Sequence, residues 1–293
     1  MSQPVIGIIG LGLMGAGLSK RLAAQGYRVA GVDVVPDKVA AARAWGVEPC
    51  GKAADLAAIA DFVLVSVTRP ADLEATVTGH NGLLSAGPGR RTRVLVDLST
   101  TDIATTKRVA DALAAAEIGF VDAPVSGGPG AAETGSLAIM AGGASEAIDA
   151  VAPIMQRLGR FTPMGGVGAG QATKLVNQAL VLTNYCVIAE AVRLAEAHGI
   201  DVARLPEALG SGHAGSNLLP VLVERMVARD FAPRGYARQV LKDLEMLNDA
   251  AHEKGLALPM AGQALTLYRL LAAAGKSELD GAAILTVWPD PKA

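Results

Sequence analysis

Short, continuous apolar runs alternate with amphipathic stretches over the first half of the chain. Between the runs, Leu13–Ala24, a stretch ending near Ala44 and Ile103–Ala116 repeat apolar residues at helical spacing. Runs that are apolar along their whole length are typical of parallel strands covered by helices on both faces. We therefore predict an α/β half built on a doubly wound parallel sheet. Its expected strands are Val5–Ile9, Arg28–Val32, Phe62–Val67, Val94–Leu98, Ser136–Ala141 and Phe161–Met164.

The pattern changes at the glycines that precede residue 170. Gly168–Gly199 consists of good helix formers without proline, so we predict one long helix of about 45 Å, suited to joining two lobes. Strand signals then stop. The remaining apolar repeats all predict helices, namely Val202–Leu209, Leu218–Ala228, Ala237–Lys254 and Pro259–Ala274. We expect a dinucleotide-binding domain at residues 1–166 and an all-helical domain for substrate binding and dimerisation at residues 167–293, with the long helix between the lobes.

Composition narrows the classes of function. Apolar residues make up 51% of the chain and the net charge is −2, without a basic stripe carrying interleaved aromatics, so we expect no nucleic-acid partner. Cys50 and Cys186 are far apart and without zinc-ligand spacing, and we expect neither a disulfide framework nor a metal site.

The apolar runs also indicate whether the chain carries a signal peptide or a membrane span. The first of them starts without a positively charged leader and reads directly into a glycine motif, which favours a strand over a signal peptide. In the long helix, Lys174 and Glu190 interrupt the apolar run, so that it is shorter than the ~18 residues that a membrane span needs. We expect a cytoplasmic protein with no membrane partner.

A glycine motif follows the first expected strand. Its spacing, G-x-G-x-x-G, lets a turn close tightly, lets a pyrophosphate approach the backbone and lets the next helix pack on the strand. The helix N-terminus adds free N–H groups for the phosphates. A Rossmann-type domain is predicted, with cofactor contacts at Gly10, Leu11, Gly12, Leu13, Met14 and Gly15.

Asp33 ends the second expected strand, where an acidic side chain binds the ribose hydroxyls of an adenosine. Its charge repels a 2′-phosphate, and no arginine follows in Val34, Val35 and Pro36, so NAD is favoured over NADP. The alternative is that Asp33 is only the N-cap of the next helix.

Polar residues follow two later strands at the same edge of the sheet. Thr68 and Thr100 are candidate cofactor contacts there. Equally, Ser99 and Thr101 would serve only to cap the helix that begins at Ile103.

A loop and a lysine are the candidates for substrate chemistry. The Ser126 hydroxyl and the backbone N–H groups of Gly127 and Gly128 form a donor array suited to a carboxylate, although such a loop is equally a simple turn. Lys174 shares one face of the long helix with Asn177 and Gln178, and a lone lysine in that place is most often a solvated charge.

Four separated segments, in this order, resemble the β-hydroxyacid dehydrogenase family. They are GLGLMG, DAPVSGG continuing through GSLAIMAGG, GAGQATKLVNQ and FAPRGYARQVLKDL. The resemblance covers nearly the whole chain and implies that Lys174 is the catalytic lysine, which exchanges the proton of a small 3-hydroxy acid as hydride moves to or from the nicotinamide.

The same resemblance implies further roles. Ser126, Gly127 and Gly128 match the loop that holds the substrate carboxylate, Thr100 a cofactor contact, and Lys242 a lysine that reaches the active site and cofactor from the helical domain. Many members have asparagine four residues after the lysine, whereas this chain has Gln178 with Asn177 beside it, as in tartronate semialdehyde reductases. The resemblance thereby leans toward a glycerate or tartronate semialdehyde substrate, while 3-hydroxyisobutyrate and short four-carbon acids stay open, since all offer the same carboxylate and hydroxyl. The family also implies a homodimer or homotetramer.

Two rival readings remain. An imine reductase shares the glycine motif and the long helix but usually lacks a lysine at position 174, and a non-catalytic dinucleotide-binding scaffold needs neither Lys174 nor Lys242. His213, in a glycine-serine loop, is either a pocket residue or a surface residue.

Overall fold

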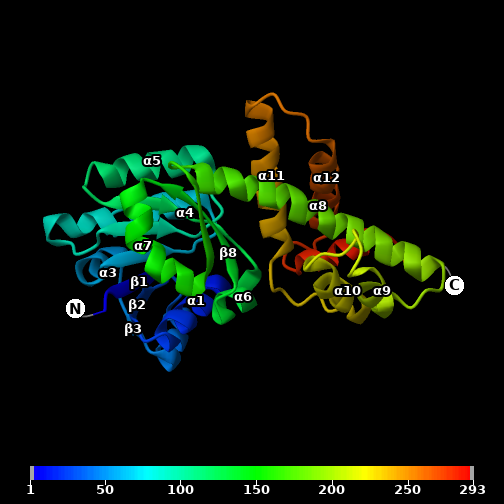
Figure 1. The fold of residues 1–293 in the computed structure, drawn as a ribbon, viewed down its shortest axis with the longest axis horizontal. Helices are drawn as coiled ribbons and strands as arrows, with labels where there is room; N and C mark the ends of the chain where they lie inside the picture. Colours follow the sequence, from blue (N-terminus) through cyan, green and yellow to red (C-terminus); the bar gives the residue numbers. More distant parts are fainter. Residues whose placement is uncertain (1–2, 291–293) are drawn as a thin grey trace. The chain divides into compact units, whose positions relative to one another are not determined.

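The computed structural model describes residues 3–290 and divides into two compact units, Met1–Lys174 and Leu175–Ala293. The first unit contains the strands, and the second is helical (Figure 1). Their boundary lies inside the long helix, α8 (Ala169–Ala197), and not before it at residue 166, where the change in composition placed it.

The first unit is built on a nine-stranded sheet with the order β3-β2-β1-β4-β5-β6-β8-β7, and β9 pairs with β8. The six strands from β3 to β6 in this order are parallel, which confirms a parallel sheet, although β3 and β6 were not among the expected strands; β9 is parallel to β8. The strands are β1 (Val5–Ile9), β2 (Arg28–Val32), β3 (Val47–Pro49), β4 (Phe62–Val65), β5 (Val94–Asp97), β6 (Gly119–Asp122), β7 (Val125–Ser126), β8 (Leu137–Gly143) and β9 (Gly159–Gly165).

One end of the sheet departs from the predicted parallel arrangement. β8 runs antiparallel to both β6 and β7. The chain between β7 and β8 is only residues 127–136, which is shorter than the crossover that a parallel neighbour requires, so it returns antiparallel. The sheet is parallel over most of its width and mixed at this end.

Helices cover both faces of the sheet (Figure 1). In β1, Ile6 and Ile8 belong to a core with Leu18 of α1, whereas Val5 and Ile9 belong to the opposite core, which includes helices α3, α4 and α5. The helices of this unit are α1 (Leu13–Ala24), α2 (Pro36–Ala42), α3 (Ala53–Ile59), α4 (Pro70–Thr78), α5 (Ile103–Ala114), α6 (Gly128–Thr134) and α7 (Ser145–Leu158), with short 3-10 helices at Arg43–Trp45 and Leu83–Gly89.

The strand order reverses beside β1. From β1 the chain moves to β2 and β3 on one side and then to β4, β5 and β6 on the other. Ligands of doubly wound sheets bind outside the carboxyl ends of the strands at such a reversal. The segment that follows β1 therefore lies where a dinucleotide is expected.

The second unit packs helices around the buried face of α8. Leu182, Cys186, Ala189 and Val192 of this helix join its core, together with the fully buried Tyr268. α11 and α12 pack side by side (Figure 1). The other elements are α9 (Leu205–Leu209), α10 (Leu218–Ala228), α11 (Ala237–Glu253), α12 (Pro259–Ala273) and 3-10 helices at Val202–Arg204 and Gly281–Val287.

By length and composition alone, α8 is long and apolar enough to cross a membrane, with a mean hydropathy of 1.4 over an 18-residue window. The charged residues of this helix, which we expected to interrupt the apolar run, do not lower its mean hydropathy below that of a candidate membrane span. A third of the window is buried inside the protein (33%), on the face that packs against the helical core. Core helices of soluble proteins share this composition, so the length of α8 is weak grounds for a membrane span.

Candidate active site

The glycine motif forms a tight turn between β1 and α1. Gly10 has φ +89°, which favours glycine, and its N–H donates to the carbonyl of Val32 over 2.9 Å. A Cβ on Gly15 would overlap the carbonyl oxygen of Gly10. Gly12 is the N-cap of α1 and supplies no side-chain cap, so the N–H groups of the first turn are left for a ligand. These features fit a bound pyrophosphate.

Asp33 is hydrogen-bonded to this turn. Its carboxylate accepts from the N–H of Leu11 at 2.7 Å and from the N–H of Val35 at 2.8 Å. The N-cap of α2 is Val35, so the alternative role of Asp33 as that cap is wrong. The carboxylate instead ties the glycine turn to the end of β2, the place where it would meet an adenosine ribose.

A lysine that the sequence analysis overlooked lies beside Asp33. Lys38 Nζ is 3.8 Å from the Asp33 carboxylate, and its side chain is half exposed. Lys38 lies beyond the three residues that follow Asp33, in the first turn of α2. Lys38 is a cation within reach of a phosphate bound near Asp33.

Thr68 and Thr100 follow the carboxyl ends of β4 and β5, at the ligand edge of the sheet; Thr68 is exposed and Thr100 half-buried. The helix after Thr100 is capped by Asp102, whose side chain accepts from the N–H of Thr105. The alternative that Ser99 and Thr101 cap this helix is therefore wrong. Ser99 instead accepts from the N–H of Val67 at 2.9 Å, which links the two strand ends.

Lys174 is hydrogen-bonded to the residue that precedes Ser126. It is only 6% exposed, and its Nζ donates to the carbonyl oxygen of Val125 at 2.8 Å. Val125 directly precedes Ser126. The reading of Lys174 as a solvated surface charge is thus wrong, and the first unit brings this lysine to the loop that the sequence assigned to a substrate carboxylate.

The loop itself is short. Gly127 has φ +133°, a region that favours glycine, and a Cβ there would lie 2.6 Å from the Cβ of Ala131. Gly128, the second glycine of the expected donor array, is already the first residue of α6. The turn passes directly into a helix and keeps its backbone N–H groups close to Ser126.

Two fully buried carboxyl groups lie beneath this edge of the sheet, Asp97 at the end of β5 and Asp122 at the end of β6. Burial raises the pKa of Asp97 to about 7 and that of Asp122 to about 6, against hydrogen bonds that lower both. Neither residue was expected at the site from the sequence. The signal was present, since each is an acidic residue that ends an otherwise apolar strand.

The second unit holds the remaining predicted residues. Asn177 donates to Gln178 at 2.8 Å, Gln178 donates to the carboxylate of Asp243 at 2.5 Å, and Lys242 Nζ lies 3.1 Å from the same carboxylate. Asn177, Gln178 and Lys242 are therefore connected through Asp243, which is 9% exposed. Asp243 is a residue that sequence reasoning missed, although it stands directly after Lys242.

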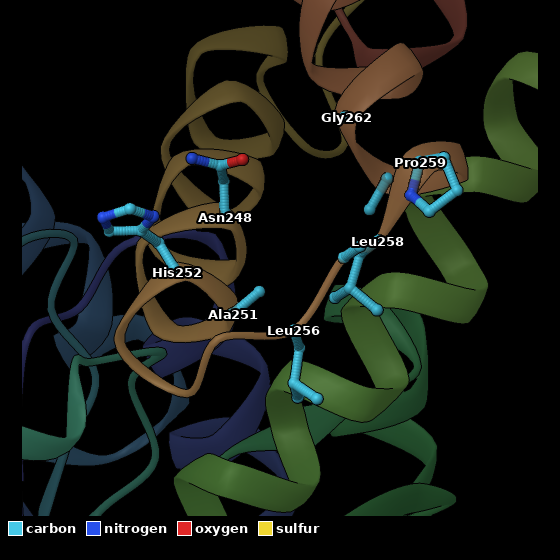
Figure 2. A pocket seen from close by; sticks show the side chains of 9 residues that line it. Asn248, Ala251, His252, Leu256, Leu258, Pro259 and Gly262 are labelled. Carbon is cyan, nitrogen blue, oxygen red and sulfur yellow. The ribbon is translucent and has the colours of Figure 1, made fainter.

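His213 is exposed in the turn between α9 and α10. Figure 2 shows a pocket elsewhere in the second unit, at the end of the α11–α12 hairpin, where Asn248 and His252 are the polar side chains among mostly apolar lining residues. It contains none of the predicted site residues. Within residues 3–290, no group of three or more histidine, cysteine, aspartate or glutamate side chains is placed to hold a metal ion.

Two family models match the chain. Residues 5–170 match the NAD-binding domain of 6-phosphogluconate dehydrogenase, and residues 168–288 match the NAD-binding domain of NADP-dependent 3-hydroxyisobutyrate dehydrogenase. A 2-hydroxy-3-oxopropionate reductase of Escherichia coli is 34% identical over 283 residues, covering 96% of this chain and 95% of the relative.

Solved structures agree with these matches. A 3-hydroxyisobutyrate dehydrogenase from Salmonella typhimurium superposes with a TM-score of 0.88 at 25% identity, covering 98% of this chain and all of the other. An imine reductase from Pseudomonas sp. has a TM-score of 0.64 at 19% identity, with 98% of this chain and 99% of that one covered, which is a likeness of fold alone. The chain belongs to the β-hydroxyacid dehydrogenase family, whose members are NAD(P)-dependent hydroxyacid dehydrogenases.

Proposed function

We propose that this protein transfers a hydride between NAD and a small 3-hydroxy acid, with Lys174 as the general acid and base. The observation that carries the proposal is the bond from Lys174 Nζ to the carbonyl of Val125, which puts an amine next to Ser126. The proposed carboxylate-binding donors and the proposed proton-transfer group are thus brought together within the first unit, although they are 49 residues apart in the sequence.

Each residue of the site has its own role in the proposed reaction. A bound nicotinamide supplies the hydride acceptor or donor. Ser126 and the N–H groups of Gly127 and Gly128 would hold the substrate carboxylate. Lys174 would accept the hydroxyl proton during oxidation and return it to the developing alkoxide during reduction. The low exposure of Lys174 keeps bulk water from its amine.

NAD is the proposed cofactor in preference to NADP. The proposal is supported by the Asp33 carboxylate, which two backbone N–H groups hold after β2, where such domains bind the adenosine ribose; its charge would repel a 2′-phosphate. Lys38 partly offsets that repulsion. We therefore propose a preference and not an absolute exclusion of NADP.

Two substrate types fit the proposal. The Asn177–Gln178 pair favours glycerate or tartronate semialdehyde, and the similar reductase of Escherichia coli acts on 2-hydroxy-3-oxopropionate by its name. The similar protein of Salmonella typhimurium is named for 3-hydroxyisobutyrate, which offers the same carboxylate and hydroxyl. We propose the semialdehyde type first. No further partner is proposed beyond a second copy of this chain.

The test is turnover measured by nicotinamide absorbance with a panel of 3-hydroxy acids and semialdehydes, with NAD and with NADP. Lys174→Ala should lower kcat by about 10²- to 10⁴-fold while cofactor binding persists. Lys107→Ala is the matched control, since Lys107 is an exposed lysine on α5 of the same unit. Wild-type kcat in Lys174→Ala would exclude the proposed acid-base role.

The same panel should include cyclic imines. Reduction of imines without turnover of any hydroxy acid would favour the imine reductase reading. If neither class reacts although NAD binds, the non-catalytic scaffold becomes the better account.

A further inference from the structure

The carboxylate of Asp122 binds the start of α8. One of its oxygens accepts from the N–H of Gly168 at 2.8 Å, and the other accepts from the N–H of Gln171 at 2.9 Å. N–H groups at a helix start lack intrahelical partners, and a negative charge there also complements the helix dipole. A strand end thus holds the first turn of the long helix from 46 and 49 residues away in the sequence.

The side chain of Gln171 attaches the same turn to the loop after β5. Its amide oxygen accepts from the N–H of Thr101 at 3.1 Å, and its Nε2 donates to the carbonyl of Ser99 at 2.9 Å. Gln171 is 1% exposed. One glutamine therefore bonds both residues that flank Thr100, the candidate cofactor contact.

Close packing leaves the first turn little freedom. A Cβ on Gly170 would overlap the carbonyl oxygen of Asp122 and lie 2.5 Å from that of Met140. The backbone of α8 therefore touches the end of β6 and the middle of β8 directly, and the hydrogen bonds act on a turn that is already in contact with the sheet.

Lys174 follows Gln171 by one turn of the same helix, so the two side chains leave α8 on neighbouring parts of its surface. Displacement of the first turn would move Lys174 Nζ away from the carbonyl of Val125. A misplacement of about 1 Å is enough to lower a rate by about 10²-fold.

We propose that Asp122 and Gln171 are positioning residues, which hold the first turn of α8 so that Lys174 meets the substrate beside Ser126. The proposal rests on the proposed function, because it requires Lys174 to be the group that transfers the proton. Neither side chain touches substrate in this account; both act through the helix that carries the lysine.

Gln171→Met is the informative variant, since methionine is similar in length and makes neither bond. It should lower kcat by about 10²-fold when measured at saturating cofactor, so that any change in cofactor affinity at Thr100 does not enter the rate. Thr173→Val is the matched control, because the Thr173 hydroxyl bonds only locally, to the carbonyl of Ala169 at 2.8 Å. Should Gln171→Met not fold, Gln171→Ala, which leaves room for water beside Thr101 and Ser99, takes its place.

A double-mutant cycle separates positioning from general loss of structure. Combining Gln171→Met with Lys174→Ala should cost no more kcat than Lys174→Ala alone, because Gln171 acts through the lysine. Additive losses, or wild-type kcat in Gln171→Met, would overturn the inference while leaving the proposed function intact. Wild-type kcat in Lys174→Ala would instead refute the proposed function itself.

Discussion

Lys174 Nζ donates a 2.8 Å hydrogen bond to the backbone carbonyl of Val125, the residue before Ser126. Arginine at position 174 would keep a positive charge and a donor for this carbonyl, but a guanidinium does not give up its proton in proteins. We expect Lys174→Arg to lose kcat by about as much as Lys174→Ala, about 10²-fold or more. Steady-state rates with the preferred acid check this. An arginine variant near wild-type rate would assign Lys174 an electrostatic role.

Ser126→Ala removes a hydroxyl donor from the proposed carboxylate site. A hydrogen bond to a charged group contributes about 1.5–3 kcal/mol, so KM for the acid should rise by about tenfold or more, with a smaller change in kcat. Ser136→Ala is the control, because the Ser136 hydroxyl is paired with Thr134 on an exposed surface. An unchanged KM would move the carboxylate site elsewhere.

Asp33 and Lys38 should act in opposite directions on cofactor choice. Asp33→Asn removes the charge that repels a 2′-phosphate, so the ratio of kcat/KM for NAD to that for NADP should fall by about tenfold or more. Lys38→Ala should lower kcat/KM with NADP and leave the NAD value near wild type. Parallel assays with the two cofactors measure both ratios. If Lys38→Ala lowered kcat/KM equally with NAD and with NADP, Lys38 would not contact the 2′-phosphate of the adenosine ribose.

Asp97 should make stability fall as pH rises. Burial raises its pKa to about 7, so the native state keeps a proton that the unfolded chain releases above about pH 4. The stabilisation that this bound proton provides is therefore fully present below about pH 4 and is lost by about pH 7. Between these values the free energy of unfolding falls by about 1.4 kcal/mol per pH unit. Asp122, with a pKa of about 6, adds to the same trend.

Asp97→Asn cannot titrate, so the free energy of unfolding should depend less steeply on pH between about pH 5 and pH 6.5, by about one proton. Urea unfolding at several pH values measures the slope. A slope equal to that of the wild type would mean that Asp97 is ionised throughout this range.

An exposed apolar stripe on α8 should contact a second copy of the chain. Val176, Leu180, Val187 and Leu194 are 62%, 64%, 48% and 63% exposed, at spacings that put them on one side of the helix. Exposed apolar patches of this kind mark contact surfaces. Light scattering should find a dimer or tetramer for the wild type and a smaller species for Leu180→Glu with Leu194→Glu. Leu270→Glu on α12, also exposed, should leave the oligomer unchanged.

The sequence was most informative where structure is local. Helix formers without proline predicted α8 almost to the residue, and the glycine spacing after β1 predicted the turn that Asp33 binds. It was least informative for single buried polar residues. Asp97, Asp122, Gln171 and Asp243 read as ordinary helix or strand-end residues until the fold brings partners to them.

The sequence by itself determined the α/β half, the helical half, the family and the candidate residues around Lys174, because backbone preference and motif spacing act over a few residues. Only the tertiary structure decided the antiparallel strand β8, the Lys38–Asp33 pair and the support of α8 by Asp122 and Gln171. The bonds from Gln171 to the loop after β5 join residues 70 and 72 positions apart. Contacts over such separations depend on how strands order themselves in the sheet, which no short pattern specifies.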